Sequence, residues 1–231
     1  MKRYVIAGLK VDMEVSGRTE RQAAAYAAPA EGDADITVAC DVKRVLALNP
    51  HLNNEETAEY LGTGAKFAKA LLDFDGSYLH ASAVVLDGKA YLFSAPSGTG
   101  KSTHTEKWCR LFGATYLNDD KPALRLVDDV WMVYGTPWSG KHDLSMPVGI
   151  PLGAITFLRR GQENTMQKLA PEIAIPKFMS QSLWRVSCPE EMEKQLRLVD
   201  HLLRRFPVWE LTCRNDDEAA EVSYAALTGK A

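Results

Sequence analysis

The sequence predicts an α/β protein, on the evidence of element order and composition. A strand-like run, a glycine-containing loop over residues 94–103 and a helical run follow one another, which is the order of a strand–loop–helix unit. The 231 residues are 46% hydrophobic and 25% charged, the proportions of a globular protein with a buried core. We expect a large α/β core over residues 78–231 and a small α+β appendage over residues 1–77.

Charge and cysteine usage narrow the class of protein. Lys and Arg number 27 against 30 Asp and Glu, giving a net charge of -3, so we expect no nucleic-acid partner. The four cysteines are scattered singly with no Cys-x-x-Cys pair, which is typical of a reducing compartment and predicts a cytoplasmic protein. No segment approaches the roughly 18 uninterrupted apolar residues of a membrane span, so no membrane partner is expected.

The elements of the appendage follow from side-chain period and capping chemistry. Alternating apolar and polar residues over Val5–Val15 predict one strand with a single buried face. Asn53 or Asn54 is expected to cap a helix that ends near Leu72, because the two glutamates that follow suit the first helical turn. The pattern also predicts a short helix and a second strand, at Thr19–Ala27 and Ile36–Cys40.

The core is expected to begin with a β-hairpin. Two strand-like runs, Leu79–Leu86 and Lys89–Phe93, flank the pair Asp87-Gly88, which is a strong signal for a two-residue hairpin turn. A helix is predicted over Thr105–Leu111, and Gly113 is expected to end it.

Between that hairpin and that helix lies a candidate phosphate-binding loop. The segment from Ala95 to Ser102 fits the pattern [Ala or Gly]-x-x-x-x-Gly-Lys-[Ser or Thr]. Its glycines let backbone N–H groups converge on phosphate oxygens, Lys101 can reach the β- and γ-phosphates, and Ser102 can ligate magnesium. The alternative is a surface glycine turn with an ordinary lysine. The predicted nucleotide contacts are Ser97, Gly98, Thr99, Gly100, Lys101, Ser102 and Thr103.

Two adjacent acids after the loop helix are the candidate carboxylates. Asp119 and Asp120 end a short apolar strand that begins at Ala114. In an open α/β sheet that strand can run parallel to the loop strand and bring its acids beside a nucleotide. The alternative is that the pair only opens a turn. A second acidic pair, Asp128-Asp129, separates two strand-like runs and is interpreted as a hairpin turn.

Composition and residue spacing suggest roles for two further segments. The loop Gly135–Asp143 is rich in turn formers and polar groups, so it can close over phosphates or hold an acceptor, or it can be a plain connector. Its candidate residues are Ser139, Gly140 and Lys141. A second set recurs at helical spacing and is interpreted as core: Met192, Leu196, Val199, Leu202, Leu203 and Phe206.

A resemblance to a known family rests on four segments: Leu79–Ala83, Ser97–Ser102, Leu117–Asp120 and Pro207–Leu211. With the Asp-capped helix that follows them, these segments resemble the catalytic domain of HPr kinase/phosphorylase and its relatives, over about Tyr78–Leu227. That group is similar in fold to the ATP-dependent phosphoenolpyruvate carboxykinases and includes short kinases found with peptide-modification systems. The resemblance implies a P-loop kinase core, while residues 1–77 do not resemble the amino-terminal domain of HPr kinase.

The resemblance also implies roles for individual residues. The loop would bind ATP with Mg²⁺, Asp119 would accept the proton of a serine hydroxyl, and Asp120 would help to hold the metal. His80, otherwise an ordinary core histidine, would contact Asp119 or the γ-phosphate. The arginine-rich signature associated with phosphorylase activity has no clear counterpart, since Leu158–Gly161 matches it only weakly. Reversible phosphorolysis is therefore not expected.

We therefore expect an ATP-dependent phosphotransferase that phosphorylates a hydroxyl, with a serine of a peptide or small protein as the first choice of acceptor. Two alternatives stay open: a kinase of a small molecule similar to free serine, and a nucleotide-binding module without turnover that switches a partner. The acid at Asp119 and the polar loop at Lys141 favour an enzyme, because a switch needs neither. The chain can be a monomer or a homo-oligomer.

Overall fold

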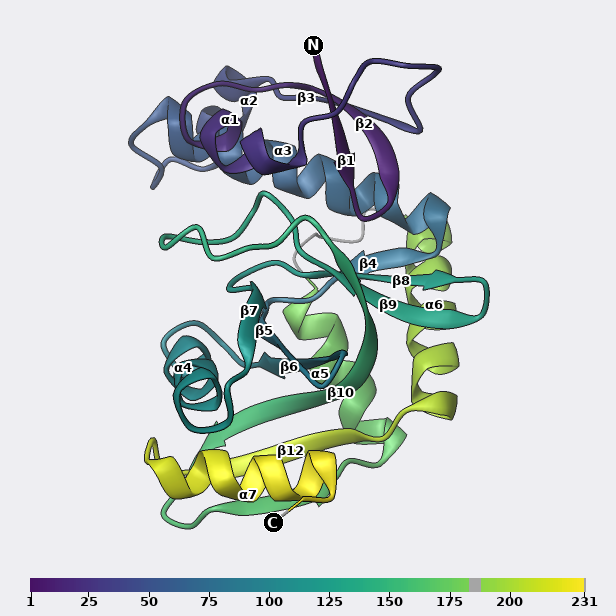
Figure 1. The fold of residues 1–231 in the computed structure, drawn as a ribbon. Coiled ribbons are helices and arrows are strands. Elements are labelled where there is room, and N and C mark those ends of the chain that lie inside the picture. Colours follow the sequence, from purple (N-terminus) through teal and green to yellow (C-terminus); the bar gives the residue numbers. More distant parts are fainter. Residues whose placement is uncertain (183–187, 231) are drawn as a thin grey trace.

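Two β-sheets form the framework of the computed structural model, which describes residues 1–182 and 188–230 (Figure 1). Residues 183–187 and 231, which fall within the predicted core range, lie outside the described residues. The smaller sheet contains β1 (Lys2–Ile6), β2 (Leu9–Glu14) and β3 (Ile36–Ala39). The larger sheet contains β4 (Gly76–Tyr78), β5 (Ala81–Leu86), β6 (Lys89–Ser94), β7 (Thr115–Asn118), β8 (Ala123–Val127), β9 (Val130–Tyr134), β10 (Gly149–Arg160), β11 (Thr165–Lys168) and β12 (Val208–Cys213).

The helices connect and cover these sheets. They are α1 (Gly17–Ala23), α2 (Val42–Leu48), α3 (Glu55–Leu71), α4 (Lys101–Phe112), α5 (Pro171–Gln181), α6 (Pro189–Arg205) and α7 (Asp217–Thr228), with 3₁₀ turns η1 (Ala24–Tyr26) and η2 (Leu72–Phe74). Within residues 1–182 and 188–230, none of these helices combines the length and apolar character needed to cross a membrane.

The larger sheet is curled because β10 belongs to both of its halves. Its order is β4-β8-β9-β10-β6-β5-β7, with β12 also paired to β10 and β11 to β12. The first residues of β10, from Gly149 to Pro151, pair antiparallel with β9, and the stretch Leu152–Phe157 pairs parallel with β6. Figure 1 shows β10 as the long, curved strand through the middle of the molecule. The parallel pairing brings the carboxyl ends of β6 and β10 to one edge of the sheet.

Two hydrophobic clusters lie against this sheet. Trp108 of α4, Leu211 of β12 and Ala220 of α7 belong to one cluster. The other contains Phe178 of α5 and Val199 of α6, and it continues without a break into the appendage. The predicted boundary between residues 77 and 78 falls inside β4, which pairs with β8 of the larger sheet. The appendage and the core therefore share one buried interior.

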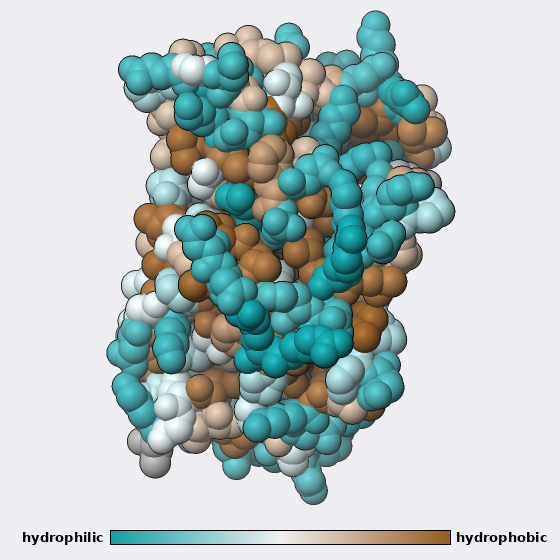
Figure 2. All heavy atoms as spheres, turned by 90° about the vertical axis from the view of Figure 1, so that its right-hand side faces the viewer, coloured by the Kyte–Doolittle hydropathy of each residue, from teal (hydrophilic) through white to brown (hydrophobic). Residues whose placement is uncertain are grey.

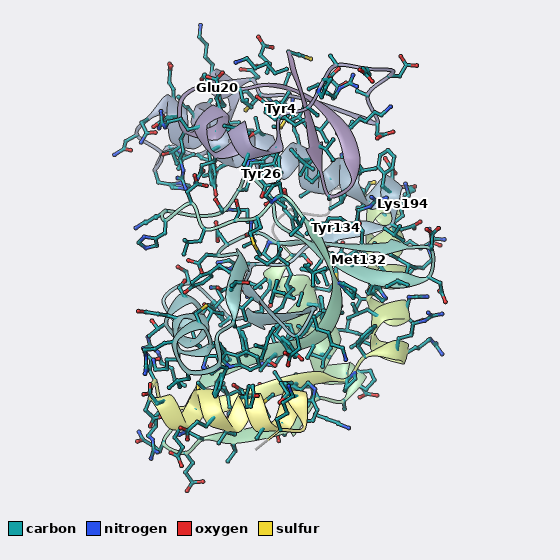
Figure 3. All side chains as sticks on the ribbon, in the orientation of Figure 1. Tyr4, Glu20, Tyr26, Met132, Tyr134 and Lys194 are labelled. Atoms are coloured by element: carbon teal, nitrogen blue, oxygen red, sulfur yellow. The ribbon has the colours of Figure 1, made fainter. Side chains whose placement is uncertain are left out.

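The surface is mostly polar on the side that carries α6. Figure 2 shows hydrophilic residues running across the middle of that face, with smaller hydrophobic patches between them. Tyr26, labelled in Figure 3, lies where the appendage meets the core and is 3% exposed. This contact region bears on the site described below.

Local sequence signals placed most of the turns and caps correctly. Asp87 and Gly88 form the β5–β6 hairpin turn with φ of 49° and 71°, and Asp128-Asp129 forms the β8–β9 turn. The side chain of Asn54 accepts a 2.7 Å hydrogen bond from the backbone N–H of Thr57 and caps α3. These predictions are confirmed.

Three predictions about elements were wrong. The Val5–Val15 segment is a hairpin rather than one strand, because the chain reverses at Ala7 and Gly8, where φ is 53° and 74°. Only residues 10–15 alternate, whereas residues 4–7 are all apolar, so the period marked just the second strand of the hairpin. Helix α4 begins at Lys101, four residues before the predicted start. On α6, Met192 and Leu196 are exposed instead of core, while Leu198 is buried.

Candidate functional site

The loop between β6 and α4 has the backbone geometry of an anion-binding turn. Gly98 and Gly100 have φ of 76° and 119°, which side chains other than hydrogen rarely tolerate. No atom lies within 4 Å of the position that a Cβ on Gly98 would take, so the loop has open space on that side. The N-terminus of α4 follows at once, and its free N–H groups favour an anion there.

Lys101 is folded inward over this loop. Its side chain is mostly buried, and its Nζ donates a 2.8 Å hydrogen bond to the carbonyl oxygen of Ala95 and a longer one of 3.5 Å to that of Pro96. Burial lowers the pKa of the Lys101 ammonium, and the charges of Asp120 and Asp119 oppose that shift. The lysine therefore rests on loop carbonyls, within reach of any anion that the loop binds.

The two candidate acids lie at the end of β7. This strand runs in the same direction as the loop strand β6, as expected, but β5 lies between them and pairs antiparallel with both. Oδ1 of Asn118 accepts hydrogen bonds from the backbone N–H groups of Asp120, at 3.0 Å, and Lys121, at 2.7 Å. That turn fixes the direction in which both acids leave the strand.

Asp119 is linked to the loop helix through hydroxyl groups. Its Oδ1 accepts a 2.6 Å hydrogen bond from Oγ of Ser82. The same Oγ lies 2.8 Å from Oγ1 of Thr105, which donates to the backbone carbonyl of Ser102 in the first turn of α4. A short chain of hydrogen bonds thus ties the carboxylate to the end of the loop.

Asp120 has charged and titratable neighbours instead. Its Oδ2 forms an ion pair with Nζ of Lys121, and its Oδ1 lies 3.5 Å from Nε2 of His80. Nδ1 of His80 is 3.3 Å from Oε1 of Gln181. Burial lowers the pKa of His80, the Lys101 charge lowers it further, and Asp120 opposes both. The structure places His80 beside Asp120 rather than Asp119, and the expected contact with a γ-phosphate stays a prediction.

The loop with Lys101, the two acids and His80 line one cleft of about 440 Å³. Of the predicted site residues, only Thr99 and Ser139 do not line it. The side chain of Ser139 is fully buried, donates a 2.8 Å hydrogen bond to Oδ1 of Asp143 and accepts one from Gln22, so in this structure it supports the loop. Sequence reasoning missed His142, which follows Lys141 in the same polar loop. The lining residues are His80, Ser97, Gly98, Gly100, Lys101, Ser102, Thr103, Asp119, Asp120, Gly140, Lys141 and His142.

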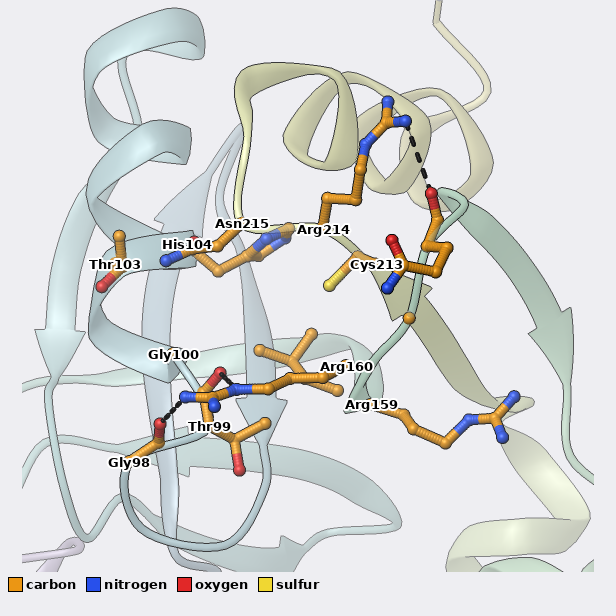
Figure 4. A pocket seen from close by; sticks show the side chains of 13 residues that line it. Gly98, Thr99, Gly100, Thr103, His104, Arg159, Arg160, Cys213, Arg214 and Asn215 are labelled. Atoms are coloured by element: carbon orange, nitrogen blue, oxygen red, sulfur yellow. Dashed lines mark hydrogen bonds between the residues drawn. The ribbon is translucent and has the colours of Figure 1, made fainter.

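A second cavity, of about 580 Å³, lies on the other side of the loop (Figure 4). It shares Gly98, Gly100 and Thr103 with the first, and Thr99 lines it. The Arg160 guanidinium donates a 2.5 Å hydrogen bond to the carbonyl of Gly98 and a 3.5 Å bond to that of Thr99. Sequence reasoning did not assign Arg160 to the site. Its position at the carboxyl end of β10, beside β6, could have indicated it.

The fold and the site together define a mixed α/β protein with a curled sheet and a glycine-containing loop beside two carboxylates. No family model matches the sequence, and no curated protein sequence matches it. Among solved structures, the HPr(Ser) kinase/phosphatase from Coxiella burnetii is similar over 66% of this chain and 97% of that chain, with a TM-score of 0.39 and 9% sequence identity. This is a distant likeness of fold, which carries no weight for activity.

Proposed function

We propose that this chain is an ATP-dependent phosphotransferase with a P-loop kinase-like core, and that it phosphorylates a hydroxyl group. One observation carries the proposal: Lys101, Ser102 and the carboxylates of Asp119 and Asp120 line the same cleft beside the phosphate-type loop. Phosphoryl transfer needs little beyond charge stabilisation, positioning and a proton acceptor. This cleft contains groups suited to each task.

The nucleotide would lie across the loop. Its phosphates would meet the backbone N–H groups around Gly98 and Gly100 and the N-terminus of α4. The nucleoside would occupy the second cavity, which shares Gly98, Gly100 and Thr103 of the loop with the first. Arg160 holds two loop carbonyls on that side and so supports the turn that presents the N–H groups.

The residues present also fit magnesium. Within residues 1–182 and 188–230, no group of three or more His, Cys, Asp or Glu side chains could hold a metal by itself. Mg²⁺ at a nucleotide site does not need such a group, because it takes one or two carboxylates together with phosphate oxygens and waters. Ser102 and Asp120 would hold it. When bound, Mg²⁺ would offset phosphate charge during transfer. Lys101 would release the Ala95 carbonyl and turn to the phosphates.

Asp119 would act as the proton acceptor. As the acceptor oxygen bonds to the γ-phosphorus, the bond from that phosphorus to the β,γ-bridging oxygen breaks and the hydroxyl proton passes to the Asp119 carboxylate. The products are ADP and a phosphorylated hydroxyl. Asp119 is the better proton acceptor of the two acids, because its hydrogen-bond partner is the neutral hydroxyl of Ser82, whereas Asp120 already pairs with the Lys121 ammonium.

The first choice of acceptor is a serine of a peptide or small protein, and free serine or a similar small molecule is the second. The test is label transfer from γ-labelled ATP, with Mg²⁺, to free serine and to serine-containing peptides. Labelled phosphoserine in either pool supports the proposal and identifies the acceptor class. Tight Mg-ATP binding with no transfer to either pool would count against it and favour a nucleotide switch, for which ATP and ADP should change the affinity for a partner differently.

A further inference from the structure

Gly140, Lys141 and His142 form one wall of the cleft. This wall is anchored in the appendage rather than in the core that carries the loop. Trp138, just before that wall, is fully buried, and its Nε1 donates a 3.2 Å hydrogen bond to Oγ1 of Thr63 on α3. Its ring stacks on Phe67 of the same helix with centroids 5.2 Å apart. A Cβ on Gly64 would lie 2.9 Å from the Trp138 ring, so glycine at that position permits the close approach. The wall therefore starts from a fixed point on α3.

Appendage side chains also bind both backbone groups of Gly140. The hydroxyl of Tyr60 accepts a 3.0 Å hydrogen bond from the Gly140 N–H. The Gly140 carbonyl accepts hydrogen bonds from the guanidinium of Arg18 and, at 3.0 Å, from Nε2 of Gln22. Gly140 has a φ of 79°, a conformation that glycine tolerates best. These contacts determine where Lys141 and His142, the next two residues, enter the cleft.

Tyr60 connects this wall to the catalytic candidates. The Arg18 guanidinium carbon lies 3.9 Å from the centroid of the Tyr60 ring, and Nζ of Lys121 lies 4.9 Å from the same centroid. Lys121 is the ion-pair partner of Asp120. The buried Tyr60 side chain thus contacts both Gly140 of the wall and Lys121.

The wall carries a lysine and a histidine. Lys141 and His142 are both exposed and, within residues 1–182 and 188–230, neither is in an ion pair. The nucleotide phosphates would already be served by the loop N–H groups, Lys101 and Mg²⁺. Lys141 and His142 line the same cleft as these groups but belong to a different segment of the chain.

We propose that the appendage sets acceptor specificity: Arg18, Gln22 and Tyr60 position the wall, and Lys141 and His142 recognise a negatively charged group next to the acceptor serine of a peptide. The inference rests on the proposed function, because it assigns an acceptor to the same cleft. Arg18, Gln22 and Tyr60 are positioning residues, since each acts through the wall.

The test uses two peptide pools that differ only in the residues beside serine, aspartate in one and lysine in the other. Wild type should label the acidic pool more than the basic one. Tyr60→Phe removes the hydrogen bond to the Gly140 N–H, and Arg18→Ala removes the hydrogen bonds to the Gly140 carbonyl and to Gln22, so each should raise the apparent KM for the acidic pool at least about three- to tenfold. The dissociation constant for Mg-ATP should change less than about twofold, because neither residue touches the loop.

Arg21→Ala is the matched control, because Arg21 lies on the same helix as Arg18 but pairs with Glu56 on the surface. It should leave the KM for the acidic pool unchanged. Equal effects of Arg18→Ala and Arg21→Ala, or an equal loss of Mg-ATP affinity and acceptor affinity, would overturn the positioning role. Preference of wild type for the basic pool, or equal labelling of the two pools, would overturn the acceptor class. Labelling of neither pool, or failure of wild type to bind Mg-ATP, would instead count against the proposed function.

Discussion

Nε2 of His80 lies 3.5 Å from Oδ1 of Asp120, whereas the neighbouring Asp119 faces the hydroxyl of Ser82. Two consecutive carboxylates therefore have different surroundings, one among charged and titratable groups and one among hydroxyls. Such a difference is how a site gives adjacent acids separate tasks. The predictions that follow assign Asp120 to the metal and Asp119 to the proton.

Lys101→Ala should abolish turnover and weaken Mg-ATP binding while leaving the fold intact. The change removes the mobile cation of the loop. Lys107→Ala is the control, because Lys107 lies on the same helix and its side chain contacts Thr103 and Asn215 at the surface. Calorimetric titration with Mg-ATP measures the affinity. Wild-type affinity and turnover in Lys101→Ala would show that the loop is not a phosphate site.

Ser102→Ala and Asp120→Asn should both raise the Mg²⁺ concentration that half-maximal transfer requires. Each removes an oxygen ligand of the metal, so excess Mg²⁺ should partly restore the rate. Titration of the transfer rate with Mg²⁺ measures the effect. A phosphoserine found at Ser102 by mass spectrometry would contradict its role as a ligand, and an unchanged Mg²⁺ requirement in both variants would contradict the metal site.

Acid should destabilise the protein through His104, which is buried on α4 beneath the loop. Burial lowers its pKa from 6.5 to about 3. The unfolded chain takes up this proton near pH 6.5 and the native chain only near pH 3, so the free energy of unfolding falls as pH falls through that window. At about 1.4 kcal/mol per pH unit, His104 should cost about 2 kcal/mol between pH 7 and pH 5.

Urea unfolding of wild type and His104→Gln at both pH values isolates this contribution. Glutamine does not titrate and can still reach Oγ of Ser223, to which Nε2 of His104 is hydrogen bonded at 3.0 Å. The variant should lose about 2 kcal/mol less than wild type on acidification. His80, whose pKa is also lowered, is present in both proteins and cancels. Identical pH dependence in the two proteins would rule out a buried, neutral His104.

Local chemistry predicted the parts of the fold that depend on neighbours in sequence. The turn at Asp87-Gly88, the cap at Asn54 and the glycine loop before Lys101 each follow from a few adjacent residues. The hairpin turn at Ala7 and Gly8 was missed because only residues 10–15 alternate, so the period marked one of the two strands.

The parts of the site that sequence reasoning missed depend on contacts between distant segments. Arg18 and Gly140, for example, are 122 positions apart in the chain, and no local pattern connects them. Ser139 was chosen for its residue type and turned out to be buried, because the appendage packs over the start of its loop. Arg160 reaches the loop only because β10 pairs beside β6.

The most direct test of the account is to measure Mg-ATP binding and phosphoryl transfer in Asp119→Asn beside wild type. Asparagine keeps the size of the side chain and can accept the Ser82 hydrogen bond, but it cannot take up the hydroxyl proton. Mg-ATP binding should therefore survive, while transfer from γ-labelled ATP to the serine acceptors should fall by about two to four orders of magnitude. Equal transfer by Asp119→Asn and wild type would contradict the account and move the proton acceptor elsewhere in the cleft, with His80 the next candidate.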